Sequence, residues 1–229
     1  MNSSELGALL HLASPTLPIG GFSYSQGLEA AVSHGLVTNA DEAHAWIDEH
    51  LFSVIAPSEA MVWLYLYDAW SLLDEEKIIH WNHWFWATRE TSEFRQETEQ
   101  MGWSLLKLIK EHRWGTDQEK QFLNTIEPMT LPCAHAFICS AQQVQAINGL
   151  HIYLYSWLEN QVMAAVKSIP LGQVASQKIL VAISKKMSSH LGVLIEQSKS
   201  EKLVLNTFAQ QLNILSSRHE HQYSRLFRS

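Results

Sequence analysis

Glycine and proline are sparse in this chain, and their scarcity constrains the fold more than any other feature. Ten Gly and six Pro occur among 229 residues, about 7% of the chain, where soluble proteins average about 12%. Folds built from short strands need frequent turn residues, which this chain does not supply. Apolar residues instead recur at helical spacing, as in Ala43, Trp46, Ile47, Leu51 and Val54. The sequence therefore predicts an all-α fold of about ten helices, packed as an irregular helical bundle.

Capping residues and breakers place the boundaries of these helices. Thr38 or Asn39 can cap a helix that Pro57 is expected to end. Gly149 is suited to be the left-handed C-cap of a helix from Cys133 to Asn148. The other helices are expected at about 4–12, 58–70, 74–87, 89–113, 117–127, 151–168 and 176–194, followed by an amphipathic helix that uses Leu203, Leu205, Phe208, Leu212 and Leu215. Because no repeat or linker interrupts the chain, we expect a single domain over residues 1–229, with 219–229 as a C-terminal docking tail.

Composition and charge exclude several classes of protein. A hydrophobic content of 46% is too high for a disordered chain. The net charge of −7 argues against a nucleic-acid partner, which requires a basic surface. The longest apolar run, Ala60 to Tyr67, is far shorter than the roughly 20 residues of a membrane span. The first residues lack the features of a secretory signal, and two cysteines are too few for a disulfide framework. We therefore expect a cytoplasmic protein with reduced thiols and no membrane partner.

The motifs of common enzyme classes are absent from the sequence. There is no GxxxxGK[ST] phosphate loop, no GxGxxG, no GxSxG nucleophile elbow and no HExxH zinc helix. No Glu is followed by His three residues later, so the helical di-metal pattern is also missing. We expect no catalytic residues and no cofactor.

Two groups of residues are weak candidates for binding a metal. Cys133, His135 and Cys139 lie close in sequence, and the last two share one helical face. The alternative for this group is a set of buried side chains in a core helix. His219 and His221 lie near the C-terminus, where a solvated helix end explains them equally well.

A loop near the N-terminus is more specified than a simple helix start requires. Its sequence, from Pro15 to Glu29, is PTLPIGGFSYSQGLE. The density of Tyr, Ser and Gln suits an adaptable contact surface, although an elaborate helix start remains the alternative. The contact candidates in this loop are Pro18, Gly20, Phe22, Tyr24, Gln26 and Glu29.

Three further stretches combine residue types that are typical of interfaces. In 89–99, six charges lie within eleven residues, either as a solvated helix face or as a partner-facing stripe. In 157–173, Lys167 interrupts an apolar helix and either extends to solvent or pairs with an acid nearby. The C-terminal segment carries Arg, Tyr and a Leu-Phe pair, which are enriched at interface hot spots. The candidates are Glu93, Arg95, Glu97, Glu159, Lys167 and Gln173, and in the tail Tyr223, Ser224, Arg225, Leu226, Phe227 and Arg228.

At these stretches the sequence resembles the UreF family of urease accessory proteins. The resemblance rests on LASPTLPIGGFSYSQGLE, RETSEFRQE, LENQVMAAVKSIPLGQVASQKIL and RHEHQYSRLFRS, in the order of the family and over nearly the whole chain. It implies an all-helical, non-catalytic factor of nickel-urease maturation. Such a protein binds a UreD/UreH-type accessory protein, recruits the nickel-carrying GTPase UreG to apo-urease, and tends to form a homodimer within the complex.

The resemblance also implies roles for individual residues. The segment from Tyr223 to Arg228 matches the part that becomes ordered on the UreD-type partner. Phe22 and Tyr24 match a loop implicated in dimer and partner contacts. Lys167 and its neighbours match a stretch thought to face the GTPase. Some members carry a cysteine near the last helix that is linked to nickel, but residues 198–229 contain none.

Two alternatives to an adaptor role follow from the same residues. In the first, Arg95 or another exposed Arg acts on the GTPase as an arginine finger, and the protein is then a GTPase activator. The cysteine and histidine candidates could instead make it a nickel-binding metallochaperone. The apolar and aromatic content of the chain, if it serves interfaces, predicts that the isolated protein is oligomeric or aggregation-prone.

Overall fold

The structure is a computed structural model that describes residues 2–200, 205–219, 222 and 225–228. Across these residues it contains eleven α-helices, a 3-10 turn and a π-helical segment but no strand, which confirms the predicted all-α fold. The elements are α1 (Ser3–Leu12), η1 (Gly21–Ser23), α2 (Leu28–Ser33), α3 (Ala40–His50), η2 (Leu51–Glu59), α4 (Ala60–Leu72), α5 (Glu75–Ala87), α6 (Ser92–His112), α7 (Asp117–Leu123), α8 (Leu131–Ala141), α9 (Ala146–Ser168), α10 (Gln173–Ser198) and α11 (Gln210–His219).

Several helices begin where the sequence supplies a capping side chain. Asn39 Oδ1 accepts hydrogen bonds from the backbone N–H groups of Asp41 and Glu42, both at 3.0 Å. Thr116 forms a reciprocal capping box with Glu119 at the start of α7. Each side chain satisfies backbone donors that the first turn of a helix leaves without partners.

The predicted helix end at Pro57 is wrong, because the chain remains helical from α3 through η2 into α4. Proline lacks a backbone N–H, and its ring collides with the carbonyl four residues earlier in a regular α-helix. The residues around Pro57 form a wider π-helical segment instead, in which Ala60 N donates to Ile55 O five residues back. The wider turn accommodates the proline ring without breaking the helix.

Gly149 is not a C-cap, which corrects a second boundary. The helix that contains Cys133 ends at Ala141, and Gln143 takes the left-handed conformation with φ of 55°. Gly149 lies inside α9, where an added Cβ would be 2.8 Å from the Trp63 ring and 3.0 Å from Cys139 Sγ. Close packing, rather than a turn, explains this glycine.

The last helix is shorter than predicted. Helix α11 begins at Gln210, and Leu205 and Phe208 precede it in non-helical chain. Leu203 lies outside the described residues.

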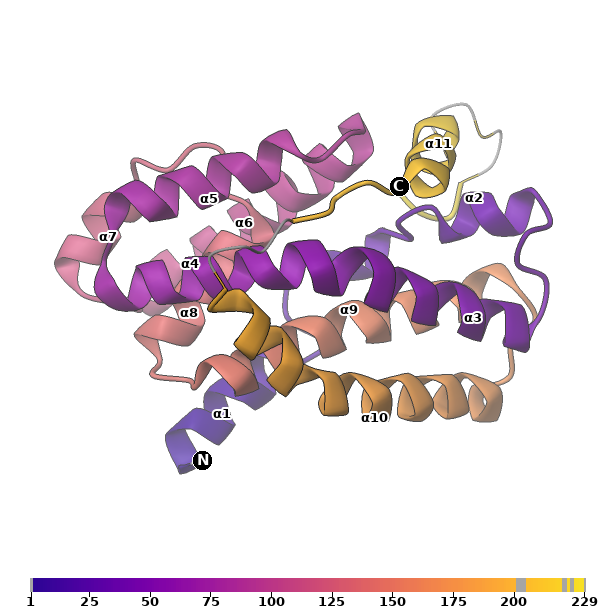
Figure 1. Cartoon of the computed structure of the whole chain (residues 1–229), viewed down its shortest axis with the longest axis horizontal. Coiled ribbons are helices and arrows are strands. Elements are labelled where there is room, and N and C mark those ends of the chain that lie inside the picture. The colour runs from indigo at the N-terminus through magenta and orange to yellow at the C-terminus, as the bar shows by residue number, and fades with distance from the viewer. Residues whose placement is uncertain (1, 201–204, 220–221, 223–224, 229) are drawn as a thin grey trace.

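The helices pack around one long helical run. Helices α3 and α4, joined by η2, cross the molecule, and α10 lies alongside α9 (Figure 1). Helix α8 packs against both α4 and α6, while α11 contacts α2 near the C-terminus. The largest fully buried side chains include Trp63, Trp70, Phe85 and Phe137. This arrangement brings the N-terminal loop, the end of α9 and the C-terminal segment to one end of the bundle.

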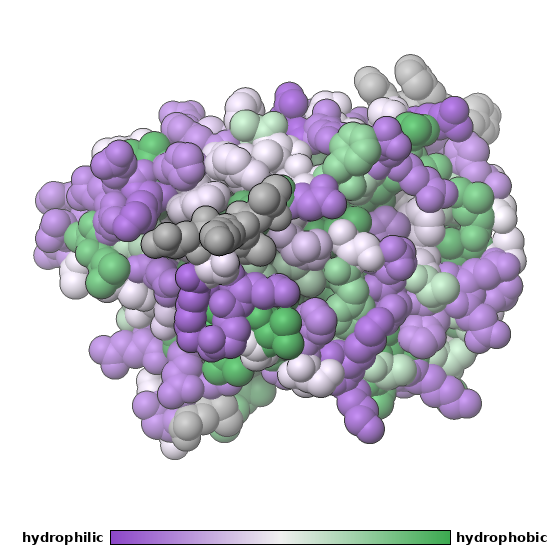
Figure 2. Space-filling model, viewed as in Figure 1, coloured by the Kyte–Doolittle hydropathy of each residue, from purple (hydrophilic) through white to green (hydrophobic). Residues whose placement is uncertain are grey.

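The described surface mixes apolar and polar residues. On the face drawn in Figure 2, hydrophobic residues form small groups between hydrophilic ones. None of the helices in the described part of the chain is long and apolar enough to cross a membrane.

Candidate functional site

Three stretches that are far apart in sequence meet around Lys167 near the end of α9. The Lys167 ammonium nitrogen lies 5.7 Å from the centre of the Phe22 ring and 5.4 Å from that of Phe227. Both distances are within the range of cation–π attraction. Arg228 N donates to Ser23 O at 2.8 Å and fixes the C-terminal segment on the loop. The structure therefore brings together candidates from three of the four stretches.

The exposed residues of these three stretches, Phe22, Lys167, Leu226 and Arg228, are together called the docking face. All four are exposed, and the apolar pair is strongly so, at 59% for Phe22 and 66% for Leu226. Phe227, between Leu226 and Arg228, is instead only 6% exposed. An exposed face with two large apolar side chains and two cations suits a partner with apolar and acidic groups.

A groove lies beside Lys167, between α9 and residues 12–22. Its volume is about 370 Å³, and its walls include Leu17, Ile19 and Met163, with Glu159 among its polar lining residues. Burial raises the pKa of the Glu159 carboxyl above its ordinary value. Pro18 is exposed in the loop that forms one wall.

Two further candidates differ in exposure, since Gly20 is half-buried and Gln173 is exposed. Gly20 takes the left-handed conformation with φ of 78° and precedes the short turn η1. Gln173 is the exposed first residue of α10.

Glu29, predicted as a contact residue, is buried and binds the chain's own C-terminal segment. Its carboxylate accepts hydrogen bonds from Leu226 N at 2.6 Å and Phe227 N at 3.2 Å. His219 Nε2, at the end of α11, lies 2.9 Å from the same carboxylate. The His219 and Glu29 side chains are 0% and 7% exposed. Glu29 therefore anchors the segment instead of facing a partner.

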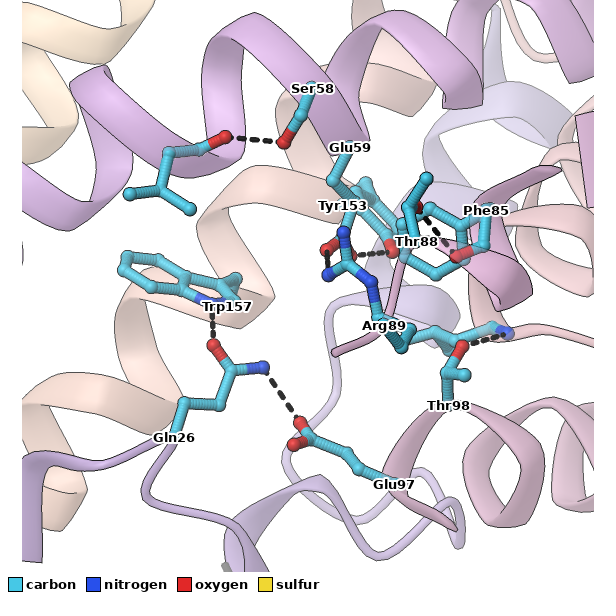
Figure 3. A network of polar contacts seen from close by, with 12 residues as sticks. Gln26, Ser58, Glu59, Phe85, Thr88, Arg89, Glu97, Thr98, Tyr153 and Trp157 are labelled. Carbon is cyan, nitrogen blue, oxygen red and sulfur yellow. Dashed lines mark hydrogen bonds and ion pairs between the residues drawn. The ribbon is translucent and has the colours of Figure 1, made fainter. Parts of the chain in front are cut away.

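Gln26 connects the loop to two helices, as Figure 3 shows. Its side-chain N–H donates to Glu97 Oε1 at 2.7 Å, and its carbonyl accepts from Trp157 Nε1 at 2.7 Å. Glu97 is 8% exposed, so its carboxylate is a structural group of the described chain. Tyr24 is also buried; burial raises its pKa, and a hydrogen bond with the Arg228 side chain opposes this effect.

Most of the charged side chains in 89–99 have partners inside the molecule. Arg89 Nη1 lies 3.4 Å from Glu59 Oε2, and Tyr153 OH donates to the other oxygen of Glu59 (Figure 3). Arg95 Nε donates to Arg89 O at 2.8 Å, and its guanidinium lies 5.5 Å from the centre of the Trp86 ring.

Two residues of this network, Glu59 and Tyr153, were not singled out from the sequence. A lone Glu beside the apolar run 60–67 was the available signal for Glu59. Glu93, by contrast, is half-buried and accepts from its neighbour Ser92 at 3.1 Å.

Cys133, His135 and Cys139 are core residues in α8. Trp63 Nε1 donates to His135 Nδ1 at 3.0 Å, and Cys139 Sγ lies 3.6 Å from the same nitrogen. Burial lowers the pKa of His135 to about 3 and raises that of Cys133 to about 12, with a shift in the same upward direction for Cys139. Metals bind the thiolate form, which this environment disfavours. Across the described residues, no group of three His, Cys, Asp or Glu is arranged to hold a metal ion.

Part of the predicted tail lies outside the described residues, namely His221, Tyr223 and Ser224. Arg225 is described and exposed.

Comparisons with known proteins give a consistent family. A family model described as UreF matches residues 37–184. The chain is 50% identical over 225 residues to the urease accessory protein UreF of Cupriavidus metallidurans, covering 98% of both chains. It is 47% identical over 220 residues to UreF of Bordetella parapertussis, covering 96% of this chain and all of that protein. It also matches the bifunctional urease accessory protein UreEF of Bordetella bronchiseptica at 47% identity, over 53% of that longer protein.

Proposed function

The chain belongs to the UreF family of urease accessory proteins and takes part in urease maturation, and on that premise we propose that it is a non-catalytic adaptor. It binds a UreD/UreH-type accessory protein, and the complex recruits the nickel-carrying GTPase UreG to apo-urease. GTP hydrolysis is thereby coupled to nickel insertion. The adaptor acts as a homodimer within this assembly.

The observation that carries this proposal is the docking face. It joins the loop, the end of α9 and the C-terminal segment, which are more than 50 residues apart in sequence, through Lys167 and the rings on either side of it. Leu226 and Phe22 are exposed there although the chain has a large core in which to bury such residues. Exposed aromatic and aliphatic side chains beside cations are typical of protein interfaces.

The internal contacts of the other candidates favour the adaptor over the two alternatives. An arginine finger must extend into another protein's active site, whereas Arg95 binds the Arg89 carbonyl and lies against Trp86. A nickel carrier needs accessible ligands, whereas Cys133 and Cys139 are 0% exposed. The second alternative is tested by equilibrium dialysis of the isolated protein, from which we expect no retained nickel at micromolar concentration.

A capture experiment with the immobilised UreD/UreH-type partner tests the adaptor role. The chain is truncated after Gln222, so that α11 and the buried His219 remain, and a second variant carries Leu226→Ala. We expect each change to weaken capture at least about tenfold, as for a central interface contact. Leu72→Ala is the matched control, because Leu72 is 78% exposed at the end of α4. Full-strength capture by the truncated chain would show that the segment does not bind this partner.

A further inference from the structure

A small polar cavity lies inside the bundle, next to the N-terminal loop. Its volume is about 50 Å³, and residues of the loop, η2, α6, α8 and α9 line it. Its buried polar side chains, three of which are drawn in Figure 3, are those of Glu59, Glu97, His135, Tyr153 and Gln161. The cavity is therefore a polar space within the core of the protein.

Two polar atoms of the residues that line this cavity have no hydrogen-bond partner among the described residues. They are His135 Nε2 and Ser156 Oγ, and both are buried from solvent. Buried polar atoms without a partner are unfavourable and rare in native proteins. Their presence at a cavity indicates a ligand that forms the missing hydrogen bonds.

The contact with Trp63 decides what His135 offers to this ligand. Trp63 Nε1 can only donate, so His135 Nδ1, 3.0 Å away, accepts through its lone pair. Burial lowers the pKa of His135 to about 3, so the ring is neutral near neutral pH and carries its one proton on Nε2. His135 Nε2 is therefore a donor, and the ligand must accept a hydrogen bond.

This requirement argues against a metal ion and favours water. A metal ion binds a nitrogen lone pair, and the lone pair of the neutral His135 ring already accepts from Trp63. Water accepts from the Nε2–H and can also donate to oxygens in the same wall, such as those of Glu59 and Ser156. Since one water molecule needs roughly 10–15 Å³, the cavity has room for at least one.

We propose that this cavity is a binding site for ordered water, held by His135 Nε2, Ser156 Oγ and the polar side chains around them. The water lies where α8 and α9 meet the N-terminal loop, and it supplies the partners that packing leaves missing. None of the four docking-face residues lines the cavity. The site is therefore independent of the proposed function.

NMR of the isolated full-length protein tests the site at His135 itself. With nitrogen-15-labelled histidine, we expect the His135 ring to carry its proton on Nε2, and the loss of its signals in His135→Gln identifies them. We also expect a dipolar cross-peak between this proton and water, which rotating-frame spectra separate from chemical exchange by its sign. A proton on Nδ1, or an Nε2 proton without dipolar contact to water, would overturn the proposal.

A substitution that fills the cavity provides a second measurement. Ser156→Val replaces the hydroxyl with two methyl groups, so we expect the cross-peak and at least one long-lived water, counted by oxygen-17 relaxation dispersion, to be lost. Ser104→Val is the matched control, because Ser104 is half-buried in α6, donates to Gln100 O at 2.9 Å and does not line the cavity. An unchanged water count in Ser156→Val would contradict the site.

A milder variant keeps the test decisive if Ser156→Val does not fold. Ser156→Ala removes one partner of the water without filling the cavity. We expect the residence time of the water to shorten by about tenfold, as for the loss of one hydrogen bond. An unchanged residence time would show that Ser156 does not hold the water.

Discussion

His135 makes the folded protein sensitive to acid through its own chemistry. Burial beside Trp63 lowers its pKa to about 3, whereas the ordinary value is 6.5. Between these values the unfolded chain binds a proton at this position and the folded chain does not, so stability is lost as the pH falls below about 6.5. One such proton corresponds to about 1.4 kcal/mol of unfolding free energy per pH unit.

The variant His135→Gln measures this contribution, because glutamine can still accept the Trp63 N–H but does not titrate. Urea unfolding at several pH values between 4 and 6 should show a steeper loss of stability in the wild-type protein, by about 1.4 kcal/mol per pH unit. His50 and His151, whose pKa values burial also lowers, remain in both proteins and cancel in the comparison. Equal slopes would show that His135 takes up a proton in the folded state.

At the scale of elements, Thr91 joins the start of α6 to α11. Its hydroxyl accepts from Phe94 N at 3.2 Å as an N-cap and lies 2.8 Å from Ser216 Oγ. Since both hydroxyls are buried, replacing either leaves the other without this partner. A double-mutant cycle with Thr91→Ala and Ser216→Ala should give a coupling energy of about 0.5–1.5 kcal/mol.

The same cycle with Asn39→Ala in place of Ser216→Ala is the control for this pair. Asn39 caps α3 through Asp41 N and Glu42 N and has no bond to Thr91 among its described contacts. We expect the Thr91 and Asn39 substitutions to be additive within about 0.5 kcal/mol in urea unfolding. Additivity of Thr91 with Ser216 would mean that the two helices are not linked through these hydroxyls.

Element boundaries were predicted well where local chemistry decides them and poorly where packing does. Asn39 was expected as a cap and is one, because capping involves only neighbouring backbone groups. The predictions that Gly149 and Pro57 mark helix ends are wrong, because both residues lie inside helical segments. Gly149 is required by close packing against Trp63, which is far away in sequence. Pro57 is accommodated by a π-helical segment, whose spacing of apolar residues resembles that of an α-helix. Local propensity contains neither kind of information.

At the scale of the whole molecule, the sequence indicates which stretches supply the candidate site, but it does not indicate which of their side chains face outward and which are buried. Unusual composition alone marked the loop, the end of α9 and the C-terminal segment as contact regions. Nothing in that composition distinguished Leu226, which faces outward, from Phe227, which is buried. Likewise Glu29 and Glu97 were expected at the surface and are internal acceptors. Such roles depend on contacts between distant segments, which spacing along one chain does not reveal.

Arg89 and Arg95, the two arginines near the start of α6, both bind groups of their own chain, and this bears on GTP hydrolysis. Arg95 is held by the Arg89 carbonyl and the Trp86 ring, while Arg89 pairs with the buried Glu59. An adaptor needs neither arginine in the GTPase active site. In single-turnover hydrolysis by the UreG-type GTPase, with the UreD/UreH-type partner present, Arg95→Gln should therefore leave the rate within about twofold of the wild-type complex. An arginine finger is worth roughly 10³–10⁵ in rate. A loss of that size in Arg95→Gln, with Lys107→Gln as an exposed control on the same helix, would identify an activator instead of an adaptor.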